Sequence, residues 1–101
     1  MFVMEDRKCA FVYILQCSDG SYYTGWSTNV SQRIATHNAG RASKYTRQRL
    51  PVRLVYSESQ PNRRVAMKRE AQIKKWSRVR KEALINTPKK HRSERKCESS
   101  C

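Results

Sequence analysis

The apolar residues near the start of the chain are arranged as two short β-strands. Residues 10–16 read AFVYILQ, an almost uninterrupted apolar run, which predicts a strand buried on both faces. Ser18, Asp19 and Gly20 follow as a turn signal, and residues 21–26, SYYTGW, are again aromatic and β-prone. The two segments therefore predict an antiparallel hairpin.

The middle of the chain predicts a helix, a loop and a third strand. Thr28 or Asn29 can cap a helix that runs to about residue 38, and residues 41–49 are a basic, polar loop. Residues 52–57 then alternate in polarity, as expected of a partly exposed strand. In this strand Val52, Leu54 and Tyr56 alternate with Arg53 and Val55. The sequence does not fix where the strand joins the sheet.

The last periodic segment, residues 62–85, has a helical pattern. Its apolar stripe, at about 100° per residue, consists of Val65, Ile73, Trp76 and Ala83. Arg69 and Arg80 interrupt that stripe, so a break is expected near Ser77. The predicted architecture is α+β: three strands in one sheet with helices packed on it.

The length of the hairpin loop decides whether two tyrosines share a face. With a three-residue loop, Gly20 takes the left-handed position, Leu15 faces Tyr23, and Tyr13 faces Gly25. Tyr13 and Tyr23 are then diagonal neighbours on one face, about 7 Å apart. A two-residue loop would place them on opposite faces.

The net charge of the chain indicates what kind of partner the protein binds. The 101 residues suffice for one compact domain, taken as residues 8–86, and carry a formal net charge of +14. So basic a chain favours polyanions such as nucleic acid. Residues 87–101 are polar and basic and are expected to be a disordered tail. No signal-peptide core or bilayer-length apolar run is present, so we expect a cytoplasmic protein that does not enter a membrane. We also expect a monomer and no small-molecule cofactor.

A few polar residues on the predicted helices carry candidate chemistry. Arg33 and His37 are four apart and lie on one side of the first helix. Glu70 sits at the shoulder of the later apolar stripe, where it is either an ion-pair partner of Lys74 or a metal ligand. This set of residues suits phosphodiester hydrolysis. A carboxylate can hold a metal ion, and the planar guanidinium of an arginine can bind a phosphate. Nearby cations are expected to lower the pKa of the tyrosines.

These residues together resemble the GIY-YIG nuclease domain. Val12-Tyr13-Ile14 stands in the place of its first motif and Tyr23-Thr24-Gly25 in the place of YIG, followed by Arg33, His37 and Glu70. The resemblance spans about residues 10–85 and is nearest to the small standalone bacterial members called YhbQ-like. It implies a three-stranded antiparallel sheet flanked by helices.

The resemblance also implies an activity and a set of roles. The protein would be a metal-dependent endonuclease in DNA repair or processing, with DNA favoured over RNA and one Mg²⁺ or Mn²⁺ bound by Glu70. Tyr23 or Tyr13 would activate or orient water, and Arg33 would stabilise the phosphate. The residues expected to line the site or contact nucleic acid are His37, Lys44, Tyr45 and Lys74. Two weaker candidates for the site are Gly25 and Asn86.

The sequence departs from the family pattern in two places, and other interpretations compete. The first motif reads Val-Tyr-Ile, and only Asn86 stands for the asparagine that many relatives place after the glutamate. A non-catalytic nucleic-acid-binding module that keeps the nuclease fold is the alternative function. An anionic-membrane binder is disfavoured because the basic helix has a narrow apolar face. Trp26 and Trp76 are interpreted as packing residues.

Overall fold

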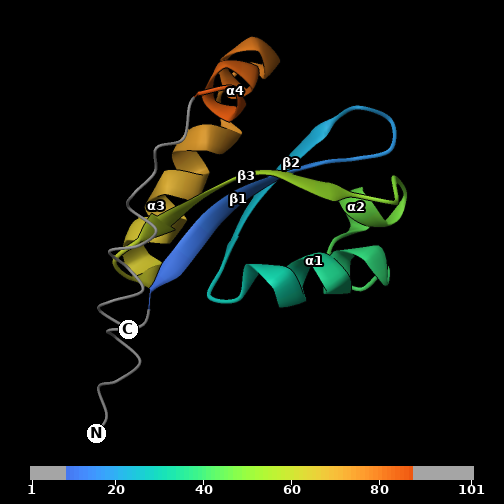
Figure 1. The fold of residues 1–101 in the computed structure, drawn as a ribbon, viewed down its shortest axis with the longest axis horizontal. Helices are drawn as coiled ribbons and strands as arrows, with labels where there is room; N and C mark the ends of the chain where they lie inside the picture. The colour runs from blue at the N-terminus through green and yellow to red at the C-terminus, as the bar shows by residue number, and fades with distance from the viewer. Residues whose placement is uncertain (1–8, 88–101) are drawn as a thin grey trace, which may run out of the picture.

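A computed structural model describes residues 9–87, which form the predicted α+β fold (Figure 1). The predicted tail lies outside the described residues apart from Thr87, as does Lys8 at the start of the predicted domain. Within residues 9–87, no helix is long and apolar enough to cross a bilayer. The elements are β1 (Ala10–Gln16), β2 (Tyr22–Ser27), α1 (Val30–Asn38), α2 (Lys44–Arg47), β3 (Arg53–Gln60), α3 (Arg63–Lys74) and α4 (Arg78–Ile85).

The three strands form one antiparallel sheet in the order β2-β1-β3. The structure thus settles the position of the third strand, which pairs with the first. The central strand β1 is the one with the continuous apolar run, because both of its faces are covered. Val12 and Ile14 on one face and Tyr13 and Leu15 on the other are all buried.

Each face of the sheet carries its own hydrophobic core. On one face Val12, Ile14 and Tyr56 pack with Ala66 and Ile73 of α3. On the other face Tyr13, Leu15, Cys17 and Val52 pack with side chains of α1 such as Val30 and Ile34. Figure 1 shows the same separation, with α3 and α4 on the left of the sheet and α1 and α2 on the right. Trp26 and Trp76 both pack against the first core, as predicted.

The hairpin loop has three residues, which confirms the first of the two predicted registers. Cys17 N–H donates to the Ser21 carbonyl oxygen at 2.8 Å, and Gly20 has a φ of 87°. A positive φ in this range suits glycine, which has no Cβ to collide with the backbone. Leu15 then pairs with Tyr23 and Tyr13 with Gly25.

One predicted loop contains a short helix. Residues 41–49 were expected to be irregular, but Lys44–Arg47 form α2, so this prediction was wrong in part. The hydroxyl oxygen of Ser43 accepts from the N–H groups of Tyr45 and Thr46, which caps the helix. The sequence did not predict this helix, because a single turn of basic and polar residues has no apolar stripe.

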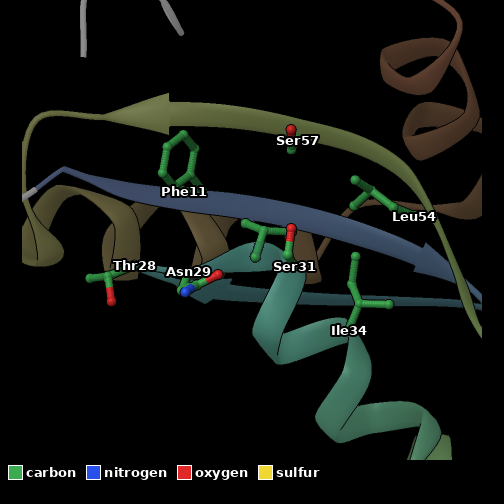
Figure 2. A pocket seen from close by; sticks show the side chains of 8 residues that line it. Phe11, Thr28, Asn29, Ser31, Ile34, Leu54 and Ser57 are labelled. Atoms are coloured by element: carbon green, nitrogen blue, oxygen red, sulfur yellow. The ribbon is translucent and has the colours of Figure 1, made fainter. Parts of the chain in front are cut away.

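A β-bulge changes the facing of β3. Ile14 pairs with Tyr56 and Leu15 with Leu54, so Val55 is an extra residue in β3. The predicted alternation of Val52, Leu54 and Tyr56 on one face is therefore wrong, since Tyr56 lies in the opposite core from Val52. Figure 2 shows Leu54 on the α1 face of the sheet; it is 41% exposed.

The predicted helical break near Ser77 is confirmed. Helix α3 ends at Lys74, and the Ser77 hydroxyl accepts from Arg80 N–H to cap α4. One member of the predicted stripe is misplaced, because Ala83 is exposed while Leu84 and Ile85 pack against the core. The break changes the helical phase, so a stripe extrapolated from α3 does not continue into α4.

Candidate active site

A small polar pocket of about 220 Å³ brings together residues from five segments of the chain. It lies beside the edge strand β2, where α3 packs against β1 and β2. Every predicted catalytic residue lines it, although these residues are up to 57 positions apart in sequence, from Tyr13 to Glu70. The lining consists of Tyr13, Tyr23, Gly25, Trp26, Arg33, His37, Ala42 and Glu70.

Gly25 makes room for the Tyr13 phenol. The two residues are cross-strand partners in the hairpin. A Cβ on Gly25 would lie 2.6 Å from the Tyr13 hydroxyl oxygen and 2.8 Å from the ring carbon that bears it. Real Cβ atoms do not approach other atoms so closely, so a side chain here would push the phenol out of place. The glycine of the second motif is therefore required by the tyrosine of the first.

A buried histidine connects the Tyr13 phenol to α2. The Tyr13 hydroxyl lies 3.1 Å from His37 Nε2, and His37 Nδ1 lies 2.8 Å from Thr46 Oγ1. Thr46 Oγ1 also lies 3.3 Å from the Ser43 carbonyl oxygen, to which it can donate. All three side chains in this chain of contacts are buried. His37 is thus neither a surface nor a capping residue.

Protonation in this network is governed by burial. Desolvation raises the pKa of Tyr13 well above its usual range, with Tyr23 adding to the rise and Arg33 opposing it. The expected lowering of this tyrosine's pKa by a nearby cation is therefore outweighed. Desolvation also lowers the pKa of His37, and Arg33 lowers it further. At neutral pH the pair is a neutral phenol against a neutral imidazole.

The second tyrosine belongs to a stack of aromatic and cationic groups. The rings of Tyr23 and Tyr45 stack with 6.1 Å between centroids, and the Arg49 guanidinium carbon lies 3.9 Å from the centroid of Tyr45. Lys74 Nζ lies 6.0 Å from the centroid of the Tyr23 ring, and the Tyr23 ring meets the His37 ring edge-on. Tyr45 and Lys74 therefore lie at the rim of the pocket, where a substrate could reach them.

Arg33 and Glu70 give the pocket one charge of each sign. Arg33 is exposed on α1 and makes no salt bridge with any carboxylate of residues 9–87. Glu70 pairs with Lys74 at 3.4 Å, and its side chain is 20% exposed against 51% for the lysine. Both alternatives predicted for Glu70 are thus compatible: the lysine contact is solvent-facing and weak, and the carboxylate still lines the pocket.

The donor set fits a loosely held hard cation better than a caged one. Among the residues that the structure describes, no three His, Cys, Asp or Glu side chains cluster as a metal site. Mg²⁺ commonly uses one or two carboxylates, keeps several waters and takes further oxygens from substrate phosphates. The lone carboxylate of Glu70 in a polar pocket that can admit a phosphate fits that pattern.

Four predicted site residues do not line the pocket: Lys44, Tyr45, Lys74 and Asn86. Lys44 is exposed at the start of α2, next to Tyr45, and does not line it. Asn86 is the C-cap of α4, and the pocket lining excludes it. Thr46 and Ala42 were not predicted, because neither is a residue that the family resemblance implies. Trp26 was interpreted only as a packing residue, but it also lines the pocket. The capping serine at position 43 was the signal that could have revealed the helix carrying Thr46.

A second hollow, shown in Figure 2, lies on the α1 face between β1, β3 and the start of α1. Its volume is about 390 Å³, which is larger than that of the polar pocket. Its lining contains no titratable side chain; it consists of Phe11, Thr28, Asn29, Val30, Ser31, Ile34, Leu54 and Ser57. Acid–base or metal chemistry is therefore assigned to the smaller pocket.

Comparison with known proteins yields close relatives that are themselves short. A UPF0213 protein of Halobacterium salinarum is 55% identical over 74 residues, which are 73% of this chain and 96% of that protein. A UPF0213 protein of Streptococcus agalactiae is 47% identical over 85 residues, which cover 84% of this chain and 93% of the relative.

Solved structures give the same result. The solution NMR structure of UPF0213 protein BH0048 from Bacillus halodurans is 40% identical and matches with a TM-score of 0.52, over 92% of this chain and 99% of that one. Protein EF2693 from E. faecalis, also 40% identical, matches with a TM-score of 0.55 over 83% and 90% of the two chains.

The family model that matches covers the fold and the pocket together. It is described as the GIY-YIG catalytic domain and matches residues 9–83, which contain all strands and every residue that lines the polar pocket. The catalytic domain of this family is that of nucleases, whose substrate is nucleic acid. By this match and by its short relatives, the chain belongs to the GIY-YIG family as a small YhbQ-like member.

Proposed function

We propose that this protein is a metal-dependent endonuclease that hydrolyses phosphodiester bonds, with DNA as its preferred substrate and DNA repair or processing as its setting. The observation that carries the proposal is the convergence of Tyr13, Tyr23, Arg33, His37 and Glu70 on one pocket. Two phenols, an imidazole, a guanidinium and a carboxylate supply a base relay, an anion-binding fork and a metal ligand, which are the parts that phosphodiester hydrolysis needs.

Arg33 binds the phosphate in this scheme. It makes no salt bridge within residues 9–87, so its guanidinium need not leave a carboxylate in order to meet a substrate. A planar guanidinium can donate two parallel hydrogen bonds to phosphate oxygens. Its charge would offset the negative charge that accumulates on the phosphoryl oxygens as the bond breaks.

Tyr13 and His37 form the proton path. When Thr46 donates its hydroxyl hydrogen to the Ser43 carbonyl, it accepts from His37 Nδ1–H, and the bare Nε2 accepts from the Tyr13 hydroxyl. The attacking water then gives its proton to the phenol oxygen as the phenol passes its own proton to Nε2. The phenolate, which burial disfavours, never needs to accumulate.

Glu70 would hold the divalent ion, Mg²⁺ or Mn²⁺. When bound, such an ion acts as a Lewis acid on a phosphate oxygen and neutralises charge on the leaving oxygen. Lys74 lies 3.4 Å from Glu70 and would balance the charge of this carboxylate when no ion is bound. Lys74 and Tyr45 contact residues that line the pocket, and both are proposed, with the exposed Lys44 beside Tyr45, to contact the nucleic-acid backbone.

The decisive experiment is a cleavage assay with a control acid from the same helical region. Duplex, nicked, branched and single-stranded DNA and RNA are incubated with Mg²⁺, with Mn²⁺ or with chelator. Glu70→Gln removes the proposed ligand without changing side-chain size. Glu82→Gln is the matched control, because Glu82 lies in α4 and pairs with Arg78 outside the pocket.

The expected result is metal-dependent cleavage by the wild type and by Glu82→Gln, best on DNA, and loss of at least about 100-fold in rate for Glu70→Gln. Binding of DNA by Glu70→Gln should stay close to wild type. Equal cleavage by both variants would remove Glu70 from the mechanism. Binding without cleavage under every metal condition would favour a module that keeps the fold and has lost catalysis.

A further inference from the structure

A second charged groove lies at the junction of α3 and α4, outside the polar pocket. Its volume is about 500 Å³, and none of its lining residues is shared with the candidate active site. The lining carries three cations, one amide and one indole and no acid: Arg69, Ala71, Gln72, Lys75, Trp76 and Arg80. We call this surface the junction groove.

The indole of Trp76 holds two guanidinium groups in place. The Arg80 guanidinium carbon lies 4.0 Å from the centroid of the Trp76 ring, and that of Arg69 lies 5.3 Å away. A guanidinium packed on an aromatic ring can still donate hydrogen bonds from its N–H edge. This edge is engaged by Glu58 in Arg69, whereas Arg80 makes no salt bridge within the described residues. The same packing leaves less ring surface for a nucleobase to stack on. The groove is therefore suited to phosphate oxygens more than to bases.

The cations of the junction groove are not all neutralised. Glu58 holds Arg69 through contacts of 2.7 and 3.3 Å, which fix its position and offset its charge. Lys75 and Arg80 make no salt bridge with any acid in the described part of the chain. The groove thus presents a net positive surface, and Glu58, which does not line it, offsets the charge of Arg69 alone.

The groove and the active site flank the same helix. On α3 the buried positions Ala66 and Ile73 face the sheet. At about 100° per residue, Glu70 lies roughly 60° to one side of Ile73 and Arg69 roughly 40° to the other. Trp76 follows just after the end of the helix. Glu70 and Arg69 are therefore about 100° apart around α3, which places the two sites within roughly one helix diameter, on the order of 10–12 Å. That is a span of very few nucleotides along a backbone.

We propose that the junction groove binds a phosphodiester backbone segment of the nucleic-acid substrate at a point distinct from the bond that is cut. The identity of the ligand rests on the proposed function. The interaction itself is electrostatic and independent of sequence, so the groove adds affinity and orients the substrate across α3 without reading bases. A substrate engaged at both places must extend past the active site on the α3–α4 side.

The test measures binding separately from cleavage. Fluorescence anisotropy with a labelled DNA duplex, in chelator so that no bond is cut, compares wild type with Lys75→Glu and Arg80→Glu. Arg47→Glu is the matched control, because it makes the same charge change in α2, across the sheet. Lys75 is exposed, so its variant stays informative if Arg80→Glu disturbs the packing of α4 on Trp76.

We expect each groove variant to weaken duplex binding by roughly tenfold and to reduce the salt slope of log K by about one. Arg47→Glu should weaken binding by much less. Groove variants that bind like wild type, or no worse than Arg47→Glu, would overturn the inference. If binding depends on the groove but the protein cleaves no substrate, the groove proposal holds and the nuclease proposal fails. If the protein cleaves normally and the groove variants bind like wild type, the nuclease proposal holds and the groove proposal fails.

Discussion

His37 is a buried residue that also lines the candidate active site. It is 1% exposed, and both of its ring nitrogens face hydroxyl oxygens, one on Tyr13 and one on Thr46. A neutral imidazole satisfies both contacts by donating one hydrogen bond and accepting the other, whereas an imidazolium has no acceptor to offer. The protonation state of this one residue therefore bears on stability and on catalysis together.

Acidification should destabilise the folded protein through His37. Burial lowers its pKa below the ordinary 6.5, so the unfolded chain takes up this proton at a higher pH than the folded one. The unfolding free energy is therefore greatest, as far as His37 is concerned, above pH 6.5 and falls as the pH drops below it toward the lowered pKa. Chemical denaturation between about pH 7.5 and 5 measures this loss.

His37→Gln is the control for that experiment, because an amide can donate and accept but does not titrate in this range. The variant should lose less stability than the wild type over the same pH interval, while its cleavage rate should fall at every pH. Identical pH profiles of stability in the two proteins would show that His37 is not the titrating group.

At the level of single residues, the sequence predicted which side chains line the pocket better than it predicted their hydrogen bonds and protonation. Tyr13, Tyr23, Arg33 and Glu70 could be selected because the order and spacing of their motifs are specific. The partnership of His37 with Thr46 could not, since nothing in a polar stretch reveals that a threonine is buried. The dominance of desolvation over the charge of Arg33 at Tyr13 also required burial, which only the fold supplies.

Among the elements, α3 has the most to position. It supplies buried Ala66 and Ile73 to the core, Glu70 to the candidate active site and Arg69 to the junction groove. Its start is fixed by Asn62, whose side-chain oxygen accepts from Val65 N–H at 3.0 Å. Loss of that cap would loosen the first turn of the helix, at the end of β3.

We expect Asn62→Ala to lower stability by about 1 kcal/mol, the usual cost of losing an N-cap, and the melting temperature by about 4–8 °C. Asn62→Asp keeps an acceptor oxygen and should melt near the wild type. Thermal unfolding followed by circular dichroism compares the three proteins. A full loss in the aspartate variant as well would mean that the amide has another role than capping.

Helices and strands with a clear period were predictable, and departures from the period were not. The first hairpin, the break near Ser77 and the helix that begins at Val30 follow from turn and capping signals. The single turn of α2 has too few residues to show a period. The bulge at Val55 was hidden because an extra residue in a strand leaves no mark in composition.

For the molecule as a whole, the net charge of +14 governs the encounter with substrate. The cations proposed to meet phosphates lie on both sides of the sheet, Arg33 and Lys44 on one and Lys74, Lys75 and Arg80 on the other. Each contact releases counterions from nucleic acid when it forms. Affinity should therefore depend strongly on ionic strength.

With five phosphate contacts, the plot of log K against log salt concentration should have a slope of about −4 to −5 on duplex DNA. Anisotropy titrations at a series of salt concentrations, in chelator, provide the measurement. Replacing Glu70 with Gln should leave the slope unchanged, because that residue is assigned to metal and not to phosphate. A slope near zero would mean that binding does not come from these cations.

The extra residue at Val55 ties together the two halves of the protein. Because the bulge shifts the pairing by one residue, Val52, just before β3, packs in the core beneath α1, and Tyr56 packs in the core beneath α3. A shift of this segment along β1 would therefore disturb the packing on both faces of the sheet. The relative position of Arg33, which lies in one layer, and Glu70, which lies in the other, therefore depends in part on the bulge in β3.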